Sequence, residues 1–100
     1  MQAYIYNADI YCSDCKKEII KRLKNEKVEP TEFDSEAWPQ GPYENGGGEA
    51  DSPNHCGGCH IFMENPLTDD GVDYVKHWVN QTPESEVTKQ WEEFYDYIDY

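Results

Sequence analysis

The sequence predicts a small α+β domain in which short strands carry two cysteine pairs. A helix and a long loop are inserted between the pairs, and helices follow at the C-terminus. The chain has 100 residues, which suits a single domain, 1–100, with a modest core. Its four cysteines form two Cys-x-x-Cys motifs, at 12–15 and 56–59. The spacing of apolar residues changes from a strand period to a helix period directly after the first motif.

The first predicted element is a strand over 3–11 that runs into Cys12, because apolar side chains alternate there and tyrosine and isoleucine favour strands. A helix is predicted from Asp14 onward. Ser13 or Asp14 can cap its start, since a short side-chain oxygen can accept a free backbone N–H. Pro30 ends any continuation of this helix.

Residues 28–55 have the composition of a long acidic loop, with four prolines and four glycines. Three aromatic side chains are embedded in it, and disordered segments are poor in aromatic residues. We therefore expect an irregular loop that its rings pin to the rest of the domain. The same three rings are the predicted partner-binding residues: Phe33, Trp38 and Tyr43.

A helical part, 68–98, is predicted after a short strand at 61–63. Thr68 can cap its first helix, with acidic residues in the first turn where the helix dipole favours them. A second helix is predicted to start at Thr82-Pro83-Glu84, because proline is tolerated at the first helical position. Its apolar stripe is expected either to pack in the core or to bind a partner: Val87, Trp91, Phe94, Tyr95 and Ile98.

The cysteines admit three interpretations. The run 56–60 spells Cys-Gly-Gly-Cys-His, which matches c-type haem attachment, but that chemistry leaves Cys12 and Cys15 unused. A redox dithiol normally opens a helix. The second motif precedes a predicted strand, and Asp14 between the first two thiols would raise their pKa. Redox chemistry therefore remains the weaker alternative.

The remaining interpretation is one metal ion shared by both pairs, because two tight turns can direct four sulfurs at one centre. The predicted ligands are Cys12, Cys15, Cys56 and Cys59, and the fold would then be zinc-ribbon-like. Zn²⁺ is the expected ion, with iron in a rubredoxin-like site as the alternative. His55 and His60 flank the second pair and are expected to be polar neighbours rather than ligands.

The formal net charge of −13 is spread unevenly along the chain. Such acidity disfavours nucleic acid and anionic membranes and favours a protein partner with a basic surface. The predicted helix after Cys12 is locally basic, with Lys17, Lys21 and Lys24 on one side. We expect this helix to pair with the acidic remainder of the chain. The alternative is nucleic-acid binding through its cations, which are Lys16, Lys17, Lys21, Arg22, Lys24 and Lys27.

No apolar run approaches the roughly 20 residues of a membrane span, and no signal peptide is recognisable at Met1. We therefore expect a cytoplasmic protein, whose thiols stay reduced. A four-cysteine site has no open coordination position, and no catalytic constellation stands out. The sequence thus predicts a protein that is not an enzyme.

Three stretches together resemble a family of small, uncharacterised four-cysteine zinc-binding proteins of bacteriophages and mobile elements. They are 4–15, the run 46–53 leading into 56–59, and 64–68. The likeness covers most of residues 4–75 and leaves out the last helix. The resemblance implies a phage-type accessory protein in the host cytoplasm. Such a protein would bind a host protein, and a component of the host's antiviral defences is one candidate.

These observations favour a zinc-stabilised protein-interaction module that inhibits host machinery. The main alternative is an acidic mimic of nucleic acid that blocks a nucleic-acid-binding protein. A Cys-x-x-Cys oxidoreductase and a nucleic-acid binder acting through the basic helix are weaker alternatives. The sequence carries no signal for the oligomeric state.

Overall fold

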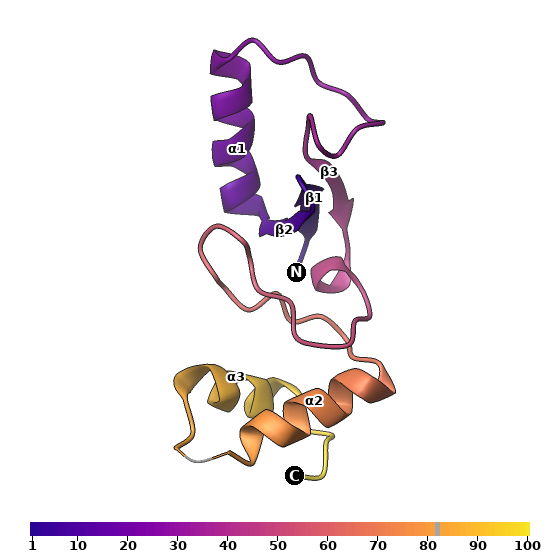
Figure 1. Ribbon diagram of the computed structural model, residues 1–100, viewed down its shortest axis with the longest axis vertical. Coiled ribbons are helices and arrows are strands. Elements are labelled where there is room, and N and C mark those ends of the chain that lie inside the picture. The colour runs from indigo at the N-terminus through magenta and orange to yellow at the C-terminus, as the bar shows by residue number, and fades with distance from the viewer. Residues whose placement is uncertain (82) are drawn as a thin grey trace.

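A three-stranded antiparallel sheet with one helix forms one half of the molecule, and two further helices form the other (Figure 1). The computed structural model describes residues 1–81 and 83–100. The predicted α+β class is confirmed. The described elements are β1 (Ala3–Tyr6), β2 (Asp9–Cys12), α1 (Ser13–Asn25), β3 (Gln40–Tyr43), the 3₁₀ turn η1 (Asn45–Gly47), α2 (Asp69–Val79) and α3 (Glu86–Phe94).

The prediction of one strand over 3–11 is wrong, because the chain reverses between β1 and β2. Asn7 and Ala8 both have positive φ, at 50° and 63°. Two left-handed residues form the tight turn whose twist matches a hairpin. The register pairs Ala3 with Cys12, so the hairpin brings the first cysteine beside the start of the chain. Alanine rarely adopts this conformation, which is why the sequence gives no turn signal.

Helix α1 follows β2 without a linker, and its N-cap is Cys12, with no side-chain capping bond. The predicted capping by Ser13 or Asp14 is therefore wrong. The helix ends before Pro30, because Lys27 turns left-handed with φ of 61° and the Val28 N–H bonds back to the Leu23 carbonyl at 2.9 Å. This pattern is a Schellman cap.

The predicted irregular loop over 28–55 contains regular structure. Strand β3 pairs antiparallel with β1 and completes the sheet in the order β2-β1-β3. The sequence hides β3 because its Gly-Pro pair suggests a turn. In η1, Gly46 has φ of 62°, and a Cβ there would lie 2.1 Å from the Met63 carbonyl oxygen, so only glycine fits.

The expectation that all three loop aromatics pin this segment is also wrong. Phe33 is 95% exposed and Tyr43 is 46% exposed, while Trp38 is half-buried. Backbone and side-chain hydrogen bonds hold the loop instead, among them Asn7 N–H to the Ser35 carbonyl at 2.8 Å.

Helix α2 begins as predicted: the Thr68 hydroxyl accepts the Gly71 N–H at 3.1 Å. The predicted start of the next helix is wrong. Ser85 is the N-cap of α3, in a capping box with Thr88. Pro83 and Glu84 lie ahead of this cap, and Thr82 is outside the described residues.

The strand expected at 61–63 is reduced to one isolated bridge between Phe62 and His55. The residues of the predicted apolar stripe on the last helix are partly buried in the core and partly exposed. Trp91, Tyr95 and Ile98 are buried, whereas Val87 and Phe94 are each 42% exposed.

Buried apolar residues form two clusters. One comprises Ala3, Cys12, Cys56 and Met63, and the other comprises Phe62, Val75, Val79, Trp91, Tyr95 and Ile98. We refer to residues 1–65, with the first of these clusters, as the sheet lobe and to residues 66–81 and 83–100 as the helical lobe. The molecule is elongated, 49 × 23 × 17 Å (Figure 1). Its radius of gyration is 15.5 Å, against about 13 Å for a compact chain of this length. That residues 1–100 fold as a single domain stays a prediction.

Candidate metal centre

The first cysteine pair lies where the sheet passes into α1. Cys12 ends β2, and Cys15 lies in the first turn of α1. A helix start bends the chain so that residues three apart share one side. The two thiols therefore face the same space, with Cys12 buried and Cys15 half-buried.

The second pair is a tight turn attached to the free edge of β2. The Gly57 N–H donates to the Ile10 carbonyl at 2.8 Å. The Cys12 N–H donates to the Cys56 sulfur at 3.3 Å, so a backbone amide of the first pair contacts a sulfur of the second. The His60 N–H closes the turn onto the Cys56 carbonyl at 2.9 Å. Pairs that are 40 residues apart in sequence thus meet through β2.

All four cysteine sulfurs lie within 4.8 Å of one another, a grouping that could hold a metal ion. The Cys12 and Cys59 sulfurs are 3.7 Å apart. None of the four cysteines forms a disulfide, and Cys59 is the exposed member of the set. These are the four cysteines that the sequence assigned to a shared site.

The electrostatics of the thiols fit a cation at their centre. Burial raises the pKa of Cys56, but N–H donors from Cys12, Cys59 and Gly58 outweigh it and lower the pKa to about 6. Burial and the neighbouring sulfurs raise the pKa of Cys15 to about 12, and burial also raises the pKa of Cys12. One thiolate is therefore favoured and further ionisation is opposed. A bound cation reverses that opposition, because it attracts every thiolate.

The two central glycines are fixed by close contacts. The Gly58 N–H donates to the Cys56 sulfur at 3.4 Å, as expected for a glycine that turns its amide toward a thiolate. A Cβ on Gly58 would lie 2.8 Å from the Cys15 sulfur, and one on Gly57 would lie 2.3 Å from the Asp9 carboxylate. Any side chain at 58 would therefore displace the Cys15 sulfur.

His55 connects the second cysteine pair to the helical lobe, a role that sequence reasoning missed. Its Nε2 lies 3.0 Å from the Trp91 Nε1–H, which can only donate. The imidazole proton therefore sits on Nδ1 and is donated to the His60 carbonyl at 2.9 Å. The ring also stacks on Phe62 at 5.4 Å. No sequence signal could indicate a bond between side chains 36 residues apart.

Of the predicted partner-binding rings, the structure brings two together. Phe33 and Trp38 line one groove of about 600 Å³ beside Pro30 and Pro39, which we call the Trp38 groove. Tyr43 lies on β3 outside this groove.

The basic helix α1 presents Lys17, Lys21 and Lys24 to solvent. Two other cations on this helix contact tyrosines rather than carboxylates. The Lys16 ammonium lies 4.5 Å above the Tyr4 ring, and Arg22 reaches the Tyr6 hydroxyl at 3.4 Å. For Lys16 and Arg22 the expected pairing with acidic side chains is therefore wrong, because both contact tyrosines.

No helix in the described part of the chain combines the length and the apolar character that a membrane crossing requires. No known protein family matches the sequence, and neither a curated protein nor a solved structure matches it.

Proposed function

We propose that this chain is a zinc-stabilised protein-interaction module. Four thiolates at about 2.3 Å from a tetrahedral Zn²⁺ would be separated from one another by about 3.8 Å. The 3.7 Å between the Cys12 and Cys59 sulfurs is already close to that separation. Zinc suits this site better than calcium or magnesium, because thiolates are soft ligands and carboxylates are absent from the set.

Zinc in this site would stabilise the fold rather than catalyse a reaction. Four protein ligands fill a tetrahedral ion, so no position is left for water or a substrate. The ion would join β2 and α1 to the second cysteine pair. It would therefore connect the two ends of the long segment that lies between the cysteine pairs. The role we propose is therefore binding of a partner protein through a surface that the ion stabilises.

The single observation that carries the interaction role is Phe33, which is 95% exposed on a loop that hydrogen bonds hold in place. The Gln40 side chain donates to the Thr31 carbonyl at 2.8 Å and to the Trp38 carbonyl at 3.0 Å, on either side of Phe33. An aromatic ring presented on an ordered backbone loses little entropy when it binds.

The partner we propose is a protein with an apolar pocket inside a basic surface. Acidic side chains surround Phe33 in the sequence: Glu29, Glu32, Asp34 and Glu36. Such charges steer a basic partner and disfavour an acidic one. Together with the resemblance to phage-type accessory proteins, this is consistent with an inhibitor of a host protein. Mimicry of nucleic acid is one form that such inhibition can take.

The test is capture of a partner by the zinc-loaded chain, compared between matched aromatic variants. Phe33→Ala should lower the amount captured by about tenfold or more, as expected for a hot-spot aromatic. Tyr97→Ala is the control, because Tyr97 is 65% exposed but lies in the helical lobe. Equal capture by the wild type and Phe33→Ala contradicts the proposed interface. If added nucleic acid competes with capture, the partner is a nucleic-acid-binding protein.

A further inference from the structure

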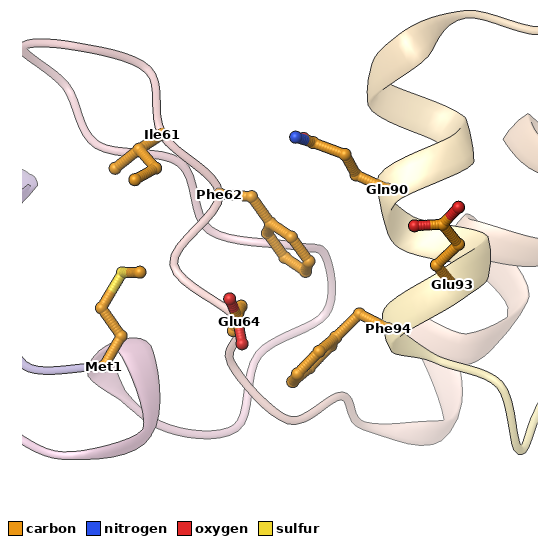
Figure 2. A pocket seen from close by; sticks show the side chains of 7 residues that line it. All are labelled: Met1, Ile61, Phe62, Glu64, Gln90, Glu93 and Phe94. Atoms are coloured by element: carbon orange, nitrogen blue, oxygen red, sulfur yellow. The ribbon is translucent and has the colours of Figure 1, made fainter.

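A second groove lies where the two lobes meet, and it shares no lining residue with the Trp38 groove. It has a volume of about 430 Å³. Figure 2 shows Phe62, from the segment that follows Cys59, pointing toward α3, which contributes Gln90, Glu93 and Phe94. The lining is completed by Met1, Ile61 and Glu64. We call this second groove the junction groove.

The floor of the junction groove is apolar and partly open to solvent. Phe62 is 7% exposed and meets Phe94 edge to face, with ring centroids 5.4 Å apart. Phe94, Ile61 and Met1 are each more than 40% exposed. Exposed apolar side chains gathered around a buried ring are typical of a contact site.

The charge of the junction groove selects its occupant. Glu64 and Glu93 supply two carboxylates, Met1 carries the α-ammonium, and the described residues that line the groove include no lysine, arginine or histidine, so the negative charges are in excess. The long stem of a lysine or arginine can lie on aromatic rings while its cationic head reaches a carboxylate. An acidic peptide would bring like charges together, and a purely apolar one would leave the excess negative charge of the groove uncompensated.

We propose that the junction groove binds a basic segment of a partner protein, in which lysine or arginine alternates with large apolar residues. The proposal rests on the interaction role given above but uses a different surface from the Trp38 groove. One wall belongs to the segment that leaves the cysteine cluster and the other to α3. A bound segment would therefore hold the lobes together, beside the bond from His55 to Trp91 at 3.0 Å.

A labelled peptide that repeats Leu-Lys-Phe-Arg is the probe, read by fluorescence polarisation on the zinc-loaded full chain. It should bind, and binding should weaken as salt is raised. A matched peptide with glutamate in place of both basic residues should not bind. Amide shifts of the isotope-labelled protein should change at Ile61, Phe62 and Phe94 and not at Phe33.

Three variants locate the site. Glu64→Gln with Glu93→Gln should weaken peptide binding about fivefold, since two partly screened charges are lost. Asp96→Asn is the control, because it makes the same kind of change on an exposed acid outside the groove and should bind within about twofold. Phe94→Ser should weaken binding about tenfold. Zinc content and helical circular dichroism establish that each variant is folded.

Several outcomes would overturn the proposal. These are absence of binding, equal binding of the acidic peptide, shifts confined to residues 30–41, or equal affinity for the carboxamide pair and the wild type. Concentration-dependent shifts of the same amides without peptide would assign the groove to a second copy of the chain instead. If the peptide does not bind the junction groove, the Phe33 capture experiment still tests the proposed function. If the capture experiment fails, the peptide experiment still tests the junction groove.

Discussion

Removal of the metal should unfold the sheet lobe while the helical lobe keeps much of its structure. The perturbation is Cys12→Ser, or chelation of the wild-type protein. Cys12 ends β2, caps α1 and donates its N–H to the Cys56 sulfur, so a metal at this site joins three segments through one residue. The helical lobe has its own buried cluster around Val75, Trp91 and Tyr95, which contains no cysteine.

The magnitudes favour this outcome. Closing the 40-residue segment between Cys15 and Cys56 costs about 3 kcal/mol, from the logarithmic dependence on length, plus a constant. Met63 is the largest side chain in the sheet-lobe cluster, and its burial contributes about 1.5–3 kcal/mol. Those two terms are of similar size. Structural zinc contributes on the order of 10 kcal/mol, so an ion bound to the four cysteines would decide whether the sheet lobe folds.

The assay is an amide correlation spectrum recorded before and after chelation. Signals from β1 should collapse into the unfolded region, while those of Val75 and Trp91 stay dispersed. Ser13→Ala is the matched control, since it alters the same turn without removing a sulfur, and its spectrum should keep the folded pattern. A zinc-free protein that melts cooperatively within a few degrees of the zinc form would refute the reasoning. The redox interpretation of the thiols would then have to be reconsidered.

Three further changes have defined outcomes. His55→Ala should lower the free energy of unfolding by about 1–3 kcal/mol in chemical denaturation, because the Trp91 indole N–H loses its partner. Burial raises the pKa of Tyr95 well above its usual range, so its contribution to stability is present below about pH 10 and lost at higher pH. Tyr95→Phe should therefore flatten the alkaline part of a stability-against-pH curve. Gly58→Ala should weaken zinc binding in a chelator competition, because its Cβ would lie 2.8 Å from the Cys15 sulfur.

Each of these changes has a comparison that isolates its cause. His60→Asn alters the other flanking histidine while tolerating its φ of 67°, and it should leave stability within about 0.5 kcal/mol. Tyr97→Phe removes a hydroxyl from a ring that is 65% exposed and should leave the alkaline curve unchanged. Equal losses in a variant and its comparison would contradict the assigned contact. For Gly58→Ala, unchanged zinc affinity would show that the Cys15 sulfur can move without cost.

Sequence alone determined the features that depend on local chemistry. The α+β class follows from the change of apolar period after Cys12, and the start of α2 follows from Thr68, whose hydroxyl accepts an N–H three residues on. The four thiols that meet were also predictable, because Cys-x-x-Cys spacing directs two sulfurs to one side of a turn wherever it occurs.

Only the tertiary structure decided the features that depend on distant partners. Strand β3 exists because β1 offers it an edge, although its own Gly-Pro pair suggests a turn. The second cysteine pair is positioned by the Ile10 carbonyl, and His55 is fixed by an indole that lies 36 residues away. A local sequence pattern determines which side-chain and backbone groups a segment can contribute to a contact. The fold determines which of those groups meet, because each distant contact depends on the packing of both lobes.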